Sequence, residues 1–293
     1  MSSDSRRHLQ KNCELFGLDR SFRSLLEIYS PEISLETYSE PLEEIPLGET
    51  RIGGIPDLPE DLPWPSTQGK HLSFLGQLRV SEIRNFDEKR VLPKQGFLYF
   101  FVDLEDLPDG QISEDASKFQ VLFCSEEKAK LVRTSPPKDS LAKTLNSFSV
   151  EYYPRASLPP EESPEAQNLN LSVDDWDRYY DLTQELERID PSDRAPKHKF
   201  LGYPDLLQGD LRLDCELIRN GLSCRDEENF RSPKIEKYET GLSDWQLIFQ
   251  IDQDEELGPD WRPPGRIYFM APKEALRNGR LEESWMVLQE GGV

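Results

Sequence analysis

Two aspartates that each follow a proline are the first residues that could do chemistry. They lie in two similar motifs, Gly-Ile-Pro-Asp-Leu at residues 54–58 and Gly-Tyr-Pro-Asp-Leu at residues 202–206. Two carboxylates can serve as general acid and base, as in glycosidases, when they lie within about 5–10 Å of each other. Asp57, Asp205 and the nearby Asp210 are therefore candidates, although an aspartate after a proline is ordinarily a turn residue.

Other polar side chains near the two motifs extend this candidate set. If the two halves of the chain enclose a cleft, a ligand site there could be lined by Arg51, Asp57, His71, Gln77, His198, Asp205, Gln208 and Gln250. Gln77 and Gln250 each interrupt an apolar stretch, and a buried amide is usually satisfied by nearby backbone. Isolated histidines are more often hydrogen-bonded structural residues than catalytic ones. The structural interpretation of these polar residues is therefore favoured over the functional one.

Metal and cofactor motifs are scarce in the sequence. The only histidines are His8, His71 and His198, without a His-Glu-x-x-His motif, so we expect no metal site. The acidic stretch from Asp252 to Glu256 could offer oxygen ligands to Ca²⁺, but it lacks the spacing of an EF-hand, and a solvated hairpin loop is favoured. Dinucleotide, Walker, kinase and nucleophile-elbow signatures do not occur. We expect no cofactor, and the sequence favours a non-enzymatic role.

The two aspartate motifs open a longer series that recurs in the same order. An apolar stretch with a glutamine follows each motif, at residues 75–78 and 249–251, and a Gly-x-apolar-Tyr-Phe stretch comes next. The latter is Gly-Phe-Leu-Tyr-Phe at residues 96–100 and Gly-Arg-Ile-Tyr-Phe at residues 265–269. Three matches in one order indicate a duplication, and two copies predict a pseudo-symmetric globule instead of a solenoid.

Local patterns place these residues mainly on strands. Apolar or alternating runs predict strands at residues 72–78, 96–102, 119–124, 148–152, 245–251, 266–270 and 285–289. Helical spacing predicts two short helices in the first thirty residues, one beginning at the cap Ser172, and a short one at residues 273–278. Residues 210–221 fit both helix and strand, and the Asp210 cap with Gly221 favours helix. Residues 31–71 are rich in proline, glycine and glutamate and predict an ordered, extended loop.

These elements predict an α+β fold with a predominantly β core of two pseudo-repeated halves, N-terminal helices and a few peripheral helices. We divide the chain into an N-terminal helical region (1–44), a first β-rich half (45–154), a proline-rich linker (155–170) and a second half (171–293). Four prolines between residues 154 and 164 predict that the linker resists regular structure. The two halves are expected to pack as one globule.

Composition narrows the range of partners. The chain has 35 basic and 56 acidic residues, which gives a net charge of −21. This charge disfavours binding to nucleic acid and to anionic membranes and favours binding to a basic protein. The N-terminus has no apolar leader, and no stretch approaches the ~18 apolar residues of a membrane span. The four cysteines lack a Cys-x-x-Cys pair and predict buried free thiols. We therefore expect a cytoplasmic protein.

Taken together, the motifs resemble the YwqG-like family, a bacterial domain of unknown function. The resemblance covers the chain from about residue 45 and rests on stretches at residues 51–59, 64–65, 74–77, 92–101, 198–210 and 245–269. It implies a mixed fold with a predominantly β core, and it brings no agreed activity or catalytic residues. Leu201 stands where the family often has glycine, which weakens the expectation for that turn. Some members occur near toxin–immunity genes, which implies an immunity or interaction role.

Two functional hypotheses follow. The first is a non-enzymatic interaction protein, immunity-like in kind, that presents an acidic face to a basic protein partner. The alternative is a small-molecule-binding protein or enzyme with its site in the cleft between the two halves.

Overall fold

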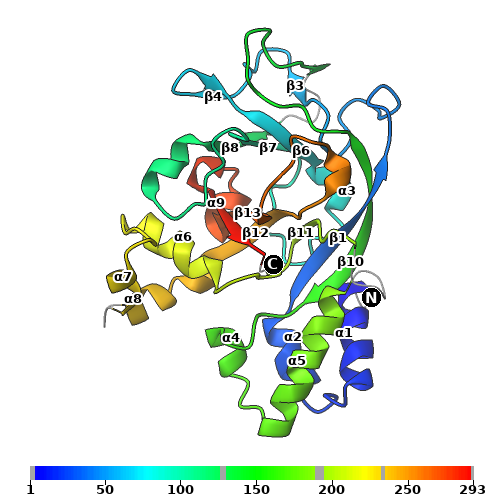
Figure 1. Cartoon of the computed structure of the whole chain (residues 1–293). Coiled ribbons are helices and arrows are strands. Elements are labelled where there is room, and N and C mark those ends of the chain that lie inside the picture. The colour runs from blue at the N-terminus through cyan, green and yellow to red at the C-terminus, as the bar shows by residue number, and fades with distance from the viewer. Residues whose placement is uncertain (1–3, 126–129, 189–194, 232–234, 292–293) are drawn as a thin grey trace.

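One large antiparallel sheet forms the body of the protein. The computed structural model describes residues 4–125, 130–188, 195–231 and 235–291 (Figure 1). In spatial order the strands are β14 (Trp285–Glu290), β13 (Gly265–Pro272), β12 (Trp245–Ile251), β11 (Lys199–Leu201), β1 (Ser30–Ser39), β10 (Phe148–Ser157), β2 (Arg51–Ile52), β6 (Ser73–Arg79), β7 (Phe97–Val102) and β8 (Phe119–Cys124). Two small sheets pair β3 (Asp57–Pro59) with β9 (Leu131–Arg133) and β4 (Ser66–Thr67) with β5 (Lys70–His71).

The strand order is palindromic about the central pair β1 and β10. On one side of this pair lie β2, β6, β7 and β8. They correspond, in this order, to β11, β12, β13 and β14 on the other side. The register agrees as well, since Gln77 lies opposite Tyr99 as Gln250 lies opposite Tyr268. Each pair of strands also has one irregularity in register, between Phe74 and Gly76 and between Leu247 and Phe249, at the same distance from its glutamine. The predicted fold class, α+β with a β core of two repeated halves, is confirmed.

The sheet bends so that its two halves pack face to face. The ring of Phe100 on β7 lies 4.8 Å from that of Phe249 on β12 and 5.2 Å from that of Phe269 on β13. These contacts belong to one hydrophobic core that draws on both halves. Because the sheet nearly closes on itself, its two edge strands, β8 and β14, come near each other.

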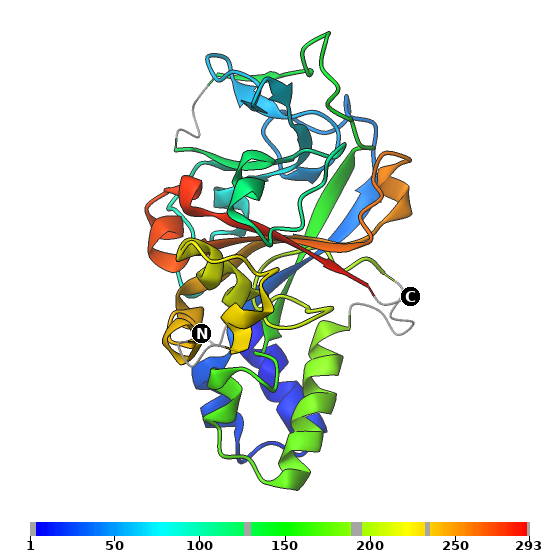
Figure 2. The same ribbon diagram turned by 60° about the vertical axis from the view of Figure 1, so that its left-hand side comes forward.

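Helices gather at one end of the sheet and around its second half. Helices α1 (Asp4–Leu15), α2 (Phe22–Ile28) and α5 (Val173–Glu187) form a separate apolar cluster at one end (Figures 1 and 2). Ser172 caps α5 by accepting a hydrogen bond from the Asp175 N–H, as predicted. The other helical segments are α3 (Val80–Ile83), η1 (Ser113–Ser117), α4 (Pro164–Gln167), α6 (Leu211–Arg219), α7 (Glu227–Arg231), α8 (Ile235–Glu239), η2 (Leu242–Asp244), η3 (Glu255–Leu257), α9 (Lys273–Arg277) and η4 (Leu281–Glu283). Within the described ranges, no helix has both the length and the apolar character that crossing a bilayer requires.

The structure differs from the sequence prediction at two proline-containing stretches. The predicted loop at residues 31–71 begins with the ten-residue strand β1, at the centre of the sheet, so the first 44 residues are helical only as far as Ile28. Pro31 is tolerated because it is the second residue of β1, outside the segment that pairs with β11. In the predicted linker, β10 continues through Pro154 to Ser157, and Pro164 opens helix α4. The ten paired residues of β1 and β10 stabilise the strands enough to outweigh the preference of these proline-containing stretches for loop conformations.

Candidate functional site

The first aspartate motif is held by a buried polar network in the first half of the sheet. Arg51 Nη1 donates to Asp57 Oδ2 at 2.6 Å. The Gln77 amide oxygen accepts from the Asp57 N–H at 2.8 Å, and its nitrogen donates to the Glu49 carbonyl at 2.8 Å and to Asp57 Oδ2 at 3.2 Å. Tyr99 Oη donates to the Asp57 carbonyl at 2.8 Å. We call Arg51, Asp57, Gln77 and Tyr99 the first network.

The second half repeats this arrangement residue for residue. The Gln250 amide oxygen accepts from the Asp205 N–H at 2.9 Å, and its nitrogen donates to the Lys197 carbonyl at 2.7 Å and to Asp205 Oδ2 at 2.8 Å. Tyr268 Oη donates to the Asp205 carbonyl at 2.7 Å, and Lys199 takes the place of Arg51 as the cation paired with the aspartate. We call Lys199, Asp205, Gln250 and Tyr268 the second network.

The charged side chains that adjoin the two networks differ between the halves. Asp57 faces two cations, because Arg133 Nε also donates to its Oδ1 at 2.9 Å. Burial opposes ionisation of Asp57, but the hydrogen bonds from Arg51 and Arg133 outweigh it and hold the pKa of its carboxyl below the usual value.

In the second network one cation serves two carboxylates. Lys199 Nζ donates to Glu32 at 2.8 Å as well as to Asp205. Burial raises the pKa of Glu32 although Lys199 opposes the shift. For Asp205, burial is outweighed by Lys199, which holds the pKa below the usual value.

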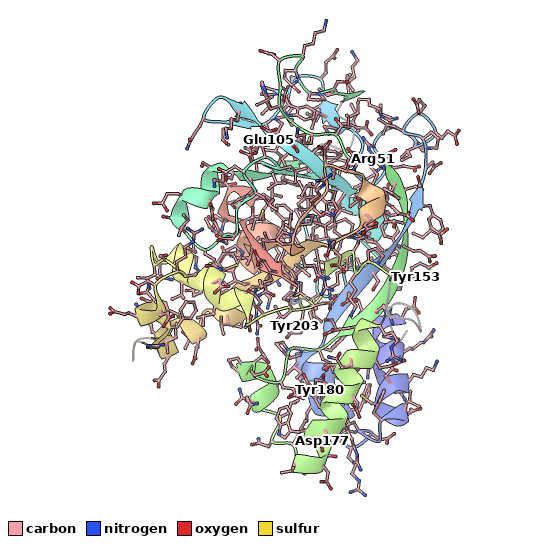
Figure 3. The ribbon with its side chains drawn as sticks, in the orientation of Figure 1. Arg51, Glu105, Tyr153, Asp177, Tyr180 and Tyr203 are labelled. Atoms are coloured by element: carbon pink, nitrogen blue, oxygen red, sulfur yellow. The ribbon has the colours of Figure 1, made fainter. Side chains whose placement is uncertain are left out.

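Both networks use their polar groups internally. The side chains of Arg51, Gln77, Lys199 and Gln250 are buried, and each amide bonds both to the aspartate motif and to a further backbone carbonyl. Arg51 Nε is buried without a hydrogen-bond partner among the described residues, but the other polar groups of these four side chains are used to position the turns. In Figure 3 Arg51 lies in the upper part of the view, and Tyr203 lies below it, near mid-height.

The remaining predicted residues lie elsewhere. Buried His198 approaches Asp254 Oδ2 through Nε2 at 3.3 Å, and its Nδ1 accepts from the Asp252 N–H at 3.1 Å. His71 lies on the short strand β5, and exposed Gln208 reaches the Glu290 carbonyl at 3.5 Å. The structure therefore distributes the eight predicted residues over two buried networks and three other positions.

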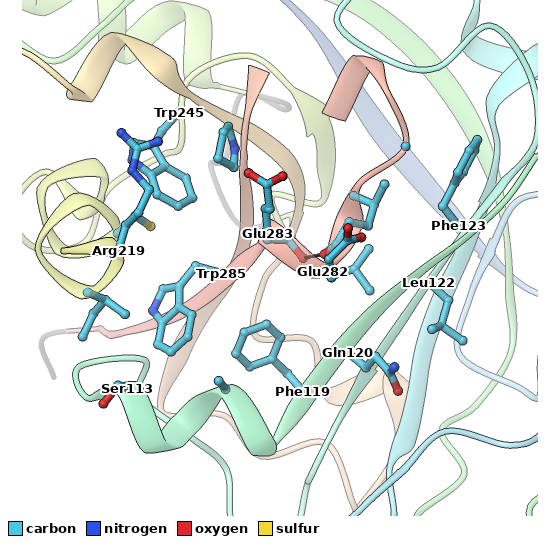
Figure 4. Close-up of a pocket in the computed structure, with 18 of the residues that line it drawn as sticks. Ser113, Phe119, Gln120, Leu122, Phe123, Arg219, Trp245, Glu282, Glu283 and Trp285 are labelled. Carbon is cyan, nitrogen blue, oxygen red and sulfur yellow. Dashed lines mark hydrogen bonds between the residues drawn. The ribbon is translucent and has the colours of Figure 1, made fainter. Parts of the chain in front are cut away.

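A groove lies where the sheet nearly closes. It has a volume of about 730 Å³ and runs between β8 with η1 on one side and α6, η4 and the start of β14 on the other (Figure 4). We call this the seam groove. Its apolar walls include Phe119, Leu122, Phe123, Trp245, Leu281 and Trp285. In the view of Figure 4 the side chains of Glu282 and Glu283 lie between Trp245 and the β8 residues Leu122 and Phe123.

The aromatic walls of the seam groove are fixed by polar contacts at their edges. Trp285 packs edge-on against Phe119 with ring centroids 5.3 Å apart, and its Nε1 donates to the Gly110 carbonyl at 2.8 Å. Trp245 Nε1 donates to Glu216 at 3.0 Å, and the Arg219 guanidinium stacks on the Trp245 ring at 5.4 Å. These rings are largely buried and already fixed, so the small parts that line the groove lose little conformational freedom when they bind a ligand.

A family model described as a domain of unknown function (DUF1963) matches residues 50–289. The chain belongs to this family. No curated protein matches the sequence. The DUF1963 match contains both polar networks and the seam groove, whereas the central strand β1 precedes it.

The lining of the seam groove in this DUF1963 protein includes hydroxyl groups, the thiol of Cys215 and the carboxylates of Glu282 and Glu283. Burial raises the pKa of the Cys215 thiol well above its usual value, and the Ser284 hydroxyl donates to the Leu281 carbonyl. Among the described residues that line the groove there is no histidine to activate either one. Glu282 and Glu283 are exposed at the rim, and Glu283 pairs with Arg280 at 2.6 Å.

Sequence reasoning did not identify any residue of this groove. Its walls come from segments between residues 67 and 285 that are far apart in the chain, and each aromatic residue alone is typical of a core. The adjacent pair Glu282 and Glu283, just before an aromatic strand, is the one local signal that could have drawn attention to it.

Proposed function

We propose that this protein is a non-enzymatic binding protein that takes a basic, partly apolar segment of a protein partner in the seam groove. The observation that carries the proposal is the pairing of fixed aromatic walls with two adjacent exposed carboxylates, Glu282 and Glu283. Aromatic side chains in a preformed pocket supply most of the binding energy in many interfaces. The carboxylates select for lysine or arginine beside the apolar groups.

The charge of the whole chain supports a basic partner. A net charge of −21 attracts cationic proteins over long range and accelerates their association at low ionic strength. The proposal also includes membership of the YwqG-like group within the DUF1963 family and a cytoplasmic setting. The occurrence of some YwqG-like members near toxin–immunity genes agrees with binding of a protein as the task.

The proposal predicts saturable binding of a defined peptide. The probe is an acetylated and amidated hexapeptide of alternating lysine and valine, titrated by calorimetry at low salt. The double variant Glu282→Gln/Glu283→Gln is expected to weaken binding about three- to tenfold, because two partly exposed ion pairs are lost. Added salt should reduce this difference, since it screens exposed charges.

A matched control is available in Glu43 and Glu44. These are also adjacent and exposed, but they lie in the connection between β1 and β2 and do not line the groove. The variant Glu43→Gln/Glu44→Gln changes the net charge equally and should bind nearly as the natural protein does. Equal weakening by both double variants would show that only overall charge matters and would contradict the groove as the site.

A second candidate occupant is a small molecule with an apolar body and one cationic group. The groove volume of about 730 Å³ lies in the range of small-molecule sites, about 300–1,000 Å³. This candidate predicts that a single amino acid amide or arylalkylamine competes fully with the hexapeptide. A protein partner predicts that such fragments compete only weakly.

A further inference from the structure

Some backbone N–H and C=O groups of the edge strand β8 point away from the sheet. In an antiparallel sheet the N–H and C=O of one residue point to the same side, and successive residues alternate. The Asp103 N–H donates to the Lys118 carbonyl at 2.7 Å. This bond determines which residues of β8 direct their backbone groups to β7 and which direct them outward. Leu122 therefore bonds to β7, while the N–H and C=O groups of Val121 and Phe123 point outward.

These outward groups lie along the wall of the seam groove. Both Val121 and Phe123 are among the residues that line it. Their outward backbone groups make no hydrogen bond to any residue in the described part of the chain. An edge of this kind can pair with an added strand.

The equivalent edge in the second half is occupied. On β8, Leu122 lies opposite Tyr99, and on β14, Val287 lies opposite the corresponding Tyr268. Leu122 therefore corresponds to Val287. Their neighbours correspond in the same way, Phe123 to Leu288 and Val121 to Met286. The Leu288 N–H donates to the Asp109 carbonyl at 3.1 Å.

Gly110, the residue after Asp109, also lies against the edge of β14. Gly110 approaches the Met286 carbonyl so closely that a Cβ there would lie 2.0 Å from its oxygen. A backbone segment of the chain itself, Asp109–Gly110, thus covers at β14 the positions whose counterparts on β8 have no backbone partner in the described residues, although η4 packs beside β8.

We propose that an extended segment of the basic partner adds to the outer edge of β8 and pairs with the backbone of Val121 and Phe123. The inference rests on the proposed function and specifies its binding mode. Side chains of an added strand alternate between two faces. Apolar side chains on one face would contact Phe119, Phe123 and Trp285, and basic side chains of the segment would approach Glu282 and Glu283. Backbone pairing supplies affinity and the side-chain contacts supply selectivity, as in other cases of strand addition.

Two isomers of the lysine–valine hexapeptide test this mode. One is N-methylated at the lysines and the other at the valines, so that side chains and charge are the same. In an added strand only alternate N–H groups face β8, so one isomer should bind about tenfold or more weakly than the other. The amides of Val121 and Phe123 should become protected from hydrogen exchange in the complex, whereas the already bonded amide of Leu288 should not change.

The possible outcomes separate this inference from the proposed function. A difference between the isomers together with protection of Val121 and Phe123 supports strand addition. Equal binding of both isomers without that protection overturns strand addition, and it leaves the proposed function standing if binding still depends on Glu282 and Glu283. Absence of saturable binding by the unmodified peptide at about 1 mM overturns both.

Discussion

Replacing Asp57 with alanine is expected to lower the free energy of unfolding by about 3–5 kcal/mol, because it leaves a buried ion pair without its anion. Arg51 is buried and Arg133 also depends on this carboxylate, so two cations would face each other without a counter-charge. The Gly48 N–H, which donates to Asp57 Oδ2 at 2.8 Å, would lose its acceptor as well. Urea denaturation of the full chain measures the change.

Two variants serve as comparisons for Asp57→Ala. Asp205→Ala should cost less, because Glu32 remains to pair with Lys199. Asp61 is exposed and lies four positions after Asp57 in the sequence, so Asp61→Ala should change stability by no more than about 0.5 kcal/mol. If Asp57→Ala and Asp61→Ala had equal effects, the structural role of the first network would be contradicted.

Replacing Gly53 with alanine is expected to cost about 3 kcal/mol or more, from a left-handed backbone combined with a steric clash. Gly53 has φ +68°, and a Cβ there would lie 1.9 Å from the Asn146 carbonyl oxygen. Its counterpart in the second half is Leu201, which adopts φ +60° with a side chain. The left-handed conformation itself is therefore tolerated, and the contact with Asn146 is what requires glycine.

Gly69 supplies the control for this prediction. It has φ +81°, but a Cβ there would meet no atom within 4 Å. Gly69→Ala should therefore show only the conformational cost, about 1 kcal/mol. Thermal or urea unfolding of both variants measures the difference, and equal losses of stability would contradict the close contact between residues 53 and 146.

The duplication could be predicted from sequence because its determinants are local. Gln77 and Gln250 interrupt apolar runs, and a buried amide needs partners, so a structural role followed from the residue type. The sequence did not reveal that each amide would bond to its own aspartate motif, since the first network joins residues 20 positions apart and the second joins residues 45 apart. The cations that pair with the two aspartates are Arg51 and Lys199. Because they differ in residue type, the sequence does not show that these two positions correspond.

The central strand and the groove could not be predicted for a different reason. Strand β1 carries Pro31 and several polar residues, and its pairing with β10 and β11 makes it a strand. The seam groove exists because the bent sheet brings β8 near η4 and β14. That proximity depends on packing between Phe100, Phe249 and Phe269, which no local pattern encodes.

The indole N–H signals of the tryptophans test the central claim, that the seam groove is the binding site. The chain has five tryptophans, and of these Trp245 and Trp285 line the groove, whereas Trp64, Trp176 and Trp261 do not. On titration with the lysine–valine hexapeptide, we expect the NMR signals of Trp245 and Trp285 to move and the other three to stay. Movement of Trp64, Trp176 or Trp261 with fixed signals from the groove pair would contradict the account.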